Sequence, residues 1–312
     1  MTKAFRIGSE GLCFCVLVND QCPVERRKEG SIMTDRRVRT VTLQQMKREG
    51  RRITVLTAYD YPMALLIDRA GVDVILVGDS GGMTVLGYEN TIPVTMDEML
   101  MMTKAVTRAV KRALVVVDMP FMSYEAEPAE AVRNAGRFVK EGLAHAVKVE
   151  RGLPSLPAVR AITDAGIPVM GHVGLTPQTT VLTEGFKVQG RALDAARRIL
   201  DDALALEKAG VFAVVLEAIP SALARVITDR LTIPTIGIGA GPDCDGQVLV
   251  THDLLGFFDG FAPKFTKRYA DLATVIGDAV GRFREEVVER RFPGPTHAYS
   301  IDEETERALL EE

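Results

Sequence analysis

The sequence predicts a (β/α)8 barrel, a closed ring of parallel strands with helices outside, from two observations. First, short apolar runs alternate with helical segments from about residue 40 onward, and eight such units over about 250 residues are typical of this barrel. Second, four runs end in an acidic residue: ILVGDS at 75–80, LVVVDMP at 114–120, AVKVE at 146–150 and VVLE at 214–217. A continuous apolar run between helices indicates a strand buried on both faces. The C-terminal strand ends of a barrel meet at one mouth, so we expect these acids to lie together there.

The elements follow in order along the chain. We expect strands at 53–57, 72–77, 114–117, 146–149, 168–174, 211–216, 234–238 and 258–263. We expect helices at 61–70, 96–111, 128–141, 156–165, 193–209, 222–230, 249–255 and 269–291. Thr95 and Glu98 have the spacing of a capping box at the start of the second helix. Gly71, Gly142 and Gly210 follow helical segments, where glycine commonly ends a helix.

Composition sets limits on the class of protein. The 312 residues are 47% hydrophobic and 26% charged with a net charge of −4, which is typical of a globular enzyme. This charge gives no support for a nucleic-acid or anionic-membrane partner, and no apolar run approaches the roughly 20 residues that span a bilayer. A doubly wound sheet is the alternative fold, but GDSGG at 78–82 lacks the spacing of a dinucleotide-binding loop.

The first thirty residues differ from the rest of the chain. They hold Cys13, Cys15 and Cys22, whose spacing fits neither a zinc site nor a disulfide framework, and they match a signal peptide poorly. We expect 1–32 to be a disordered or non-native extension, 33–299 to be one barrel domain and 300–312 to be an acidic tail. Cys244 is then the only thiol of the mature fold, in a reducing compartment.

Three of the strand-end acids predict a metal site. Asp79, Asp118 and Glu150 end the second, third and fourth strands, which are neighbours in a barrel. Carboxylates meeting in a small space repel one another unless a cation joins them, and hard oxygen ligands suit Mg²⁺. The chain has four His and no paired metal motif, which argues against zinc.

Four further residues complete the predicted site. Lys148 shares a strand face with Glu150 and is either a Schiff-base nucleophile or, as the metal cluster favours, a cation that binds a substrate carboxylate. Glu217 has no charged neighbour in sequence, so we expect a raised pKa and a role as general base. His172 is expected to hydrogen-bond substrate or shuttle a proton, and Ser80 to bind a substrate oxygen. Together these residues indicate a metal-dependent enzyme that enolises a small oxo-acid.

Nine motifs resemble those of the ketopantoate hydroxymethyltransferase family, in order over roughly residues 38–299. They are TAYDY (57–61), VGDS (77–80), GMTV (82–85), DMPFM (118–122), VKVE (147–150), GHVGLTPQ (171–178), KVQGR (187–191), IGIGAG (236–241) and FPG (292–294) with His297. The resemblance implies a barrel of the phosphoenolpyruvate/pyruvate superfamily. It also implies transfer of a hydroxymethyl group from 5,10-methylenetetrahydrofolate to 3-methyl-2-oxobutanoate, for pantothenate and coenzyme A biosynthesis.

The resemblance also implies roles for individual residues. Asp79, Asp118 and Glu150 are expected around Mg²⁺, directly or through water, and Glu217 as the proton acceptor. The substrate-binding set is expected to be Asp79, Ser80, Asp118, Lys148 and His172. Members of the family are cytoplasmic homo-oligomers, commonly decamers, acting on small molecules.

Two departures and two alternatives accompany the resemblance. Gly81 stands where the family usually has a large apolar residue, and is expected to loosen the turn after Ser80. Arg151 stands where the family usually has Gly, and adds positive charge beside Glu150. A sister Mg²⁺ barrel of the isocitrate lyase or phosphonopyruvate type is one alternative, although no cysteine-containing lid motif is seen. A non-catalytic barrel is the other, although all the strand-end acids are present.

Overall fold

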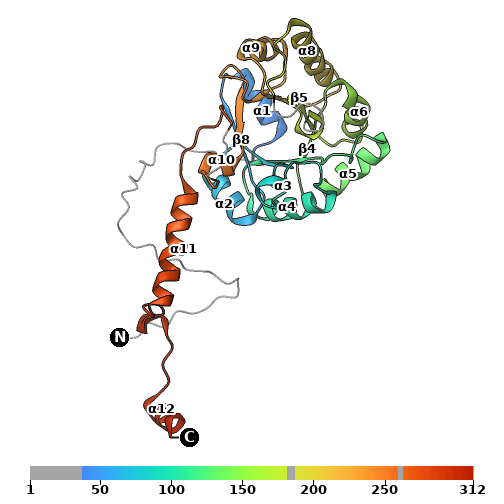
Figure 1. Cartoon of the computed structure of the whole chain (residues 1–312). Helices are drawn as coiled ribbons and strands as arrows, with labels where there is room; N and C mark the ends of the chain where they lie inside the picture. The colour runs from blue at the N-terminus through green and yellow to red at the C-terminus, as the bar shows by residue number, and fades with distance from the viewer. Residues whose placement is uncertain (1–36, 181–186, 259–262, 312) are drawn as a thin grey trace. The chain divides into compact units, whose positions relative to one another are not determined.

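Eight parallel strands close into a barrel in which each strand pairs with its neighbours in sequence and β8 pairs with β1 (Figure 1). The fold is that of a computed structural model, which describes residues 37–180, 187–258 and 263–311. The predicted extension 1–32 and its three cysteines lie outside these ranges. The strands are β1 (Ile53–Thr57), β2 (Val74–Val77), β3 (Leu114–Asp118), β4 (Ala146–Val149), β5 (Val169–Gly174), β6 (Ala213–Glu217), β7 (Thr235–Ile238) and β8 (Gly246–Leu249). The predicted fold class is therefore confirmed.

The described helices include all eight predicted ones, which begin within three residues of their expected starts, together with an N-terminal helix and several short ones that were not predicted. They are α1 (Thr40–Arg48), α2 (Tyr61–Arg69), α3 (Gly81–Thr84), α4 (Met96–Ala109), α5 (Pro128–Lys140), η1 (Leu153–Ser155), α6 (Leu156–Asp164), α7 (Pro177–Thr180), α8 (Leu193–Lys208), α9 (Ser221–Arg230), α10 (Thr251–Leu255), α11 (Leu272–Val288), η2 (Pro295–His297) and α12 (Glu303–Leu310). The capping box of α4 is confirmed, since Thr95 Oγ1 accepts from the Glu98 amide at 3.2 Å and Glu98 accepts from the Thr95 amide at 2.8 Å. Such a cap stabilises a helix by about 1 kcal/mol.

The eighth strand was predicted in the wrong place. The barrel closes through Gly246–Leu249 rather than 258–263, whose residues 259–262 lie outside the described ranges. The closing segment GQVL is short and begins with glycine, a residue that disfavours strands. Glycine is needed because a Cβ at Gly246 would lie 2.5 Å from the Ile53 carbonyl oxygen of β1. A turn rather than a helix joins β7 to β8, so the expected strand–helix alternation fails at this point.

The core has two parts, one inside the barrel and one between barrel and helices. Inside, alternate strand residues such as Val55, Val74 and Val116 form one buried cluster. Outside, the intervening strand residues pack against the helices, where α5 buries Ala135 and Phe138 three residues apart. Side chains of the described strands therefore fill the lower barrel, below the mouth.

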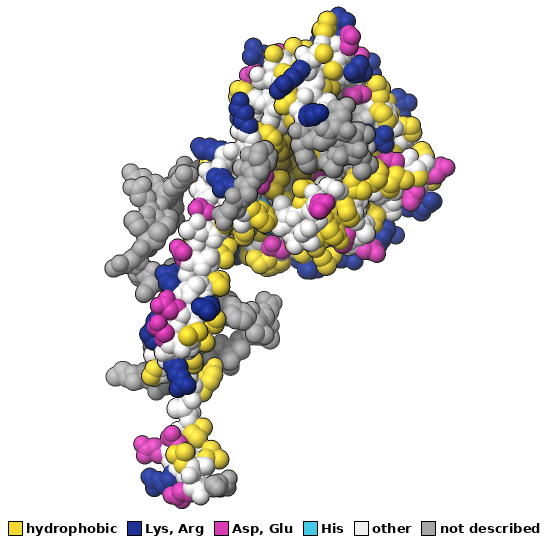
Figure 2. Space-filling view, viewed as in Figure 1, with side chains coloured by type: hydrophobic (Ala, Val, Ile, Leu, Met, Phe, Trp, Pro, Cys, Tyr) yellow, Lys and Arg dark blue, Asp and Glu magenta, His cyan; other side chains and the backbone are white. Residues whose placement is uncertain are grey.

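The C-terminal part carries a helix whose apolar face is largely exposed, although Phe283 on that face packs against the Phe292 ring. α11 has no buried residue, and its exposed Ile276, Val280, Phe283 and Val287 recur every three or four residues along one face. Figure 2 shows apolar side chains along α11 beside charged ones. The tail predicted at 300–312 contains a short helix, α12. Among the described residues, no helix is long and apolar enough to cross a membrane.

Candidate active site

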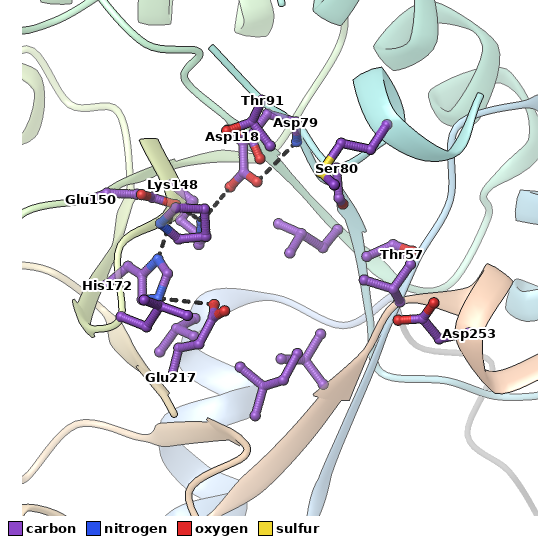
Figure 3. A pocket seen from close by; sticks show the side chains of 18 of the residues that line it. Thr57, Asp79, Ser80, Thr91, Asp118, Lys148, Glu150, His172, Glu217 and Asp253 are labelled. Carbon is purple, nitrogen blue, oxygen red and sulfur yellow. Dashed lines mark hydrogen bonds and ion pairs between the residues drawn. The ribbon is translucent and has the colours of Figure 1, made fainter. Parts of the chain in front are cut away.

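A cavity of about 330 Å³ lies at the C-terminal ends of the strands (Figure 3). All seven residues predicted from the sequence line it: Asp79, Ser80, Asp118, Lys148, Glu150, His172 and Glu217. Its apolar floor includes Leu76, Val215 and Val248. The cavity lies where barrel enzymes have their active sites. The residues predicted from separate strands therefore form a single site.

The two-residue period of the strands positions the polar side chains. Lys148 follows Ala146, a member of the buried cluster inside the barrel, at a spacing of two. His172 follows Met170 and Glu217 follows Val215 in the same way. Each strand thus contributes an apolar side chain to the interior and a polar one directly above it. The polar groups enter the cavity because the strands end there.

Lys148 is the central cation of the site. Its Nζ lies 2.8 Å from Asp118 Oδ1 and 3.4 Å from Glu150 Oε1, and all three side chains are almost fully buried. Asp118 and Lys148 are paired in register between β3 and β4. Burial lowers the pKa of Lys148, but the charges of Asp118, Glu150 and Asp79 raise it by more, so the pKa lies above its usual value. A Schiff base needs a neutral amine, and the geometry therefore favours the charge-partner interpretation of Lys148.

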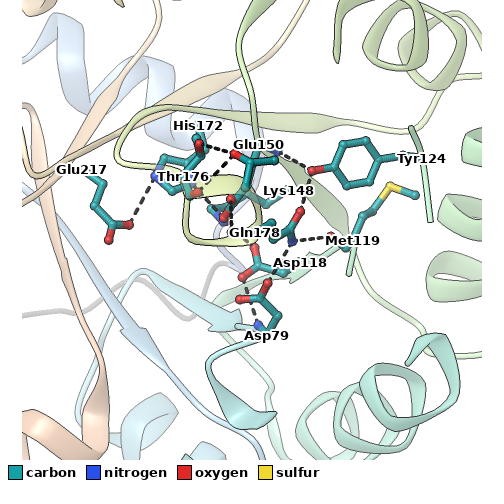
Figure 4. Close-up of polar contacts among 11 residues, drawn as sticks. Asp79, Asp118, Met119, Tyr124, Lys148, Glu150, His172, Thr176, Gln178 and Glu217 are labelled. Atoms are coloured by element: carbon teal, nitrogen blue, oxygen red, sulfur yellow. Dashed lines mark hydrogen bonds and ion pairs between the residues drawn. The ribbon is translucent and has the colours of Figure 1, made fainter. Parts of the chain in front are cut away.

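Gln178 holds the acids in place and was not predicted as a site residue. It is fully buried and lies on α7. Its side-chain Nε2 donates to Asp79 Oδ2 at 2.8 Å and to the Met119 carbonyl at 2.9 Å. Its backbone amide donates to Glu150 Oε2 at 3.3 Å (Figure 4). Tyr124 Oη donates to Gln178 Oε1 at 2.6 Å. In the sequence Gln178 appears only as the last residue of the GHVGLTPQ motif, and the fold brings it to Asp79, 99 residues away.

His172 joins two carboxylates on opposite sides of its ring. Nδ1 lies 3.1 Å from Glu150 Oε1 and Nε2 lies 3.3 Å from Glu217 Oε2, the second contact being an ion-pair distance without hydrogen-bond alignment (Figures 3 and 4). Burial and Lys148 lower the pKa of His172, but Glu150 and Glu217 raise it by more, to about 9. Glu217 thus has a charged neighbour that its own sequence context does not reveal.

Asp79 and Glu150 have opposite pKa shifts. Burial, together with the charges of Asp118 and Glu150, raises the pKa of Asp79 well above its usual value. Burial also raises the pKa of Glu150, but Lys148 and His172 lower it by more, to about 2. The positive charge of the site is therefore concentrated around Glu150, and Asp79 is the carboxylate without a cation of its own.

Ser80 is held by Tyr59 on the β1 side of the cavity. Their hydroxyl oxygens are 2.9 Å apart, and burial raises the pKa of Tyr59 to about 12, which keeps its hydroxyl protonated. The loosening expected at Gly81 stays a prediction. Gly81 is buried in α3, and a Cβ there would lie 2.7 Å from both Met102 Sδ and Tyr59 Cδ1. In this chain Tyr59 and Met102 fill the space that a larger side chain at position 81 would occupy.

Arg151, the other departure, stands in a strained backbone conformation. Its φ is +85°, in the left-handed region that favours glycine. It lines a second cavity of about 260 Å³ with Tyr124 and Glu125 rather than the main one. The charge of Arg151 therefore lies behind the strand ends and not in the cavity that holds the predicted site.

The metal site predicted at Asp79, Asp118 and Glu150 stays a prediction. Within the described ranges, no group of three or more His, Cys, Asp or Glu is arranged to hold a metal ion directly. Lys148 lies between Asp118 and Glu150, so the three carboxylates do not converge on one point in this structure.

The chain is similar to known proteins of one family. Residues 37–295 match the family model described as ketopantoate hydroxymethyltransferase. A relative from Moorella thermoacetica, 3-methyl-2-oxobutanoate hydroxymethyltransferase, is 60% identical over 263 residues, covering 84% of this chain and 98% of the relative. A relative of the same name from Thermoanaerobacter sp. is 53% identical over 268 residues, covering 86% and 98%.

Solved structures share the fold at low identity. A phosphonopyruvate hydrolase in complex with oxalate and Mg²⁺ superposes with a TM-score of 0.53 at 17% identity, covering 88% of this chain and 96% of that one. A phosphoenolpyruvate phosphomutase from Streptomyces platensis subsp. rosaceus also has a TM-score of 0.53 at 17% identity, covering 81% and 99%. These two likenesses support the fold alone, whereas the family match and the close relatives identify the activity. The chain is an enzyme, a hydroxymethyl transferase, and belongs to the ketopantoate hydroxymethyltransferase family.

Proposed function

We propose that this chain transfers a hydroxymethyl group from 5,10-methylenetetrahydrofolate to C3 of 3-methyl-2-oxobutanoate, giving 2-dehydropantoate (ketopantoate). The names of its relatives support the oxo-acid substrate. The observation that carries the proposal is the position of Glu217, which faces the Asp118–Lys148 pair within one cavity (Figure 3). A small oxo-acid bound to the cation then presents its C–H to a carboxylate.

Lys148 and Ser80 are the proposed anchors of the oxo-acid. Lys148 is a buried ammonium, and a buried cation attracts a carboxylate far more strongly than an exposed one does. Ser80 lines the same cavity with a hydroxyl whose partner is Tyr59. Ser80 follows β2, across the barrel from Glu217 at the end of β6, so an oxo-acid held by these two groups presents its C3 end to that residue.

Mg²⁺ is the proposed cofactor, held by Asp79 and Asp118 with Glu150 nearby. The donor set fits, because all three residues offer hard oxygen atoms. The charge also fits, because Asp79, Asp118, Glu150 and Glu217 against Lys148 and His172 leave a formal charge of −2 in a buried site. When bound, the ion supplies Lewis acidity that favours loss of the C3 proton from a chelated 2-oxo acid.

Glu217 is the proposed base. Its carboxylate takes the C3 proton, and the electron pair left on C3 forms the new C–C bond to the folate methylene carbon. Both C–N bonds of the methylene bridge break, water supplies the hydroxyl oxygen, and N5 and N10 take up the abstracted proton and one proton of the water, so that tetrahydrofolate leaves. His172 lies 3.3 Å from Glu217 Oε2 and keeps the carboxylate directed into the cavity.

Proton NMR of 3-methyl-2-oxobutanoate in D₂O tests the proposal in two stages. With protein and Mg²⁺ but no folate, we expect the C3 proton signal to disappear. Addition of 5,10-methylenetetrahydrofolate should then give ketopantoate. Exchange without product would mean that the barrel uses another electrophile. No exchange by folded protein would refute this substrate and favour a sister barrel activity.

We further propose that the enzyme is a homo-oligomer, with a decamer expected from the family, and that α11 contributes to its interface. The support is the apolar stripe at Ile276, Val280, Phe283 and Val287, which is exposed in the single chain. Such a stripe is typical of a helix that packs on a partner. Phe283→Asp should lower the mass measured by light scattering, whereas Arg284→Asp, one position away, should not. An unchanged mass for Phe283→Asp would contradict this role of α11.

A further inference from the structure

The cavity has a second half with a different chemical character. Opposite Lys148 and the acids, its wall is formed mostly by apolar side chains, including Ile238, Val248 and Val250. Asp253 is the one carboxylate in this half among the described lining residues, and it lies across the cavity from Asp118 (Figure 3). An oxo-acid bound at Lys148 does not need this half, so it is available for the second substrate.

Asp253 lacks a partner of its own. It lies on α10, just after β8, and no described residue gives its carboxylate a hydrogen bond or an ion pair. Burial raises its pKa, and the charge of Arg268 lowers it by less. A half-buried carboxylate without hydrogen bonds is costly, so a ligand that supplies N–H donors at this point stabilises the site.

Flat aromatic surfaces border the same carboxylate. The Phe265 ring lines the cavity and lies over Gly239, where a Cβ would be 2.7 Å from Phe265 Cδ1. Asp253 also lines an adjoining cavity of about 260 Å³ together with His252 and Phe258, whose rings stack with centroids 6.1 Å apart. The site therefore combines a carboxylate with faces on which a planar heterocycle can stack.

We propose that Asp253 binds the aminopyrimidinone edge of the folate pterin, with the Phe265 ring against the pterin face. This inference rests on the proposed function. The edge presents the N3–H and the 2-amino group side by side, and a carboxylate accepts such a donor pair through two parallel hydrogen bonds. With the pterin at Asp253 and the oxo-acid at Lys148, the methylene carbon lies between the two halves of the cavity. It then faces C3 of the oxo-acid, from which Glu217 removes the proton.

A change in the ligand tests the contact without altering the protein. The 2-desamino-2-methyl analogue of 5,10-methylenetetrahydrofolate lacks the 2-amino donor but keeps the reactive methylene group. Wild-type enzyme should use it with a kcat/KM lower by about tenfold or more, the effect of one charge-assisted hydrogen bond. Equal use of both folates by wild type would overturn the proposal.

A variant of Asp253, compared on both folates, completes a cycle that pairs the change in the protein with the change in the ligand. Asp253→Asn should raise the KM for methylenetetrahydrofolate by about tenfold and abolish the preference for the 2-amino form. It should leave the folate-free exchange of the C3 proton intact. Asp243→Asn, a carboxylate that pairs with Arg225 outside the cavity, should change neither quantity. An unchanged folate preference in Asp253→Asn would overturn the proposal, whereas absence of exchange in the wild type would instead refute the proposed function.

Discussion

Replacement of Gln178 by Met removes an amide on which three buried groups depend. Gln178 bonds Asp79 at 2.8 Å, the Met119 carbonyl at 2.9 Å and Tyr124 Oη at 2.6 Å. Met has a similar volume, so no large cavity is expected. Each lost hydrogen bond costs about 1 kcal/mol, and more where a buried partner stays unsatisfied. The free energy of unfolding should therefore fall by about 3–5 kcal/mol.

Urea unfolding at one fixed protein concentration measures this loss, since oligomer stability depends on concentration. Gln247→Met is the matched control, because Gln247 is an exposed amide with a single bond to the Gly241 carbonyl at 2.9 Å. The free energy of unfolding of Gln247→Met should lie within about 0.5 kcal/mol of the wild-type value. Calorimetry should also show weaker Mg²⁺-dependent oxo-acid binding by Gln178→Met, because Asp79 loses its anchor. A loss below about 1 kcal/mol with unchanged oxo-acid affinity would refute the structural role of Gln178.

Four further predictions follow from single residues. Glu217→Gln should keep oxo-acid binding but slow C3 proton exchange by about 10²–10⁴-fold, and normal exchange would contradict the base assignment. His145 accepts a hydrogen bond from the Val115 amide, and burial lowers its pKa to about 4. Stability is therefore full above about pH 6.5 and should fall by about 1–2 kcal/mol toward pH 4, allowing for partial exposure; a pH profile of unfolding unchanged in His145→Gln would argue against this. Arg151→Gly should stabilise the fold by about 1 kcal/mol in urea, because it relieves a positive φ. Burial raises the pKa of Cys244, so peptide mapping should find it unlabelled by thiol reagents until the protein unfolds.

The sequence predicts most of the barrel because its buried strands are continuous apolar runs. β3 and β4 were expected within one residue of their observed bounds, since a strand buried on both faces leaves little ambiguity. The prediction of β8 failed because the position of this strand is set by its pairing with β1 through Gly246. That pairing is a tertiary contact without a local sequence signal. The helix α1 was also missed, and only Leu43 and Met46 are buried on it.

The predicted site residues share one local signal, a polar group at the end of an apolar strand. Asp118 and Glu217 are the last residues of β3 and β6, so their location at the mouth follows from the fold class. Gln178 has no such signal, because it lies on a four-residue helix in a loop. The contact between His172 and Glu217 was missed for another reason. It depends on the register of β5 against β6, in which His172 pairs with Val215, and periodicity alone does not give register.

The division of the cavity into two halves has a consequence for the order of the reaction. Lys148, His172 and the acids are held by contacts within the protein, so the charged half is preorganised before either substrate binds. Among the described residues, no hydrogen bond or ion pair joins that half to Asp253 or Phe265. Proton abstraction from the oxo-acid therefore needs only the charged half and should proceed without folate. If exchange instead required a folate that cannot transfer carbon, such as tetrahydrofolate, pterin binding would have to complete the charged half, and the independence of the two halves would be wrong.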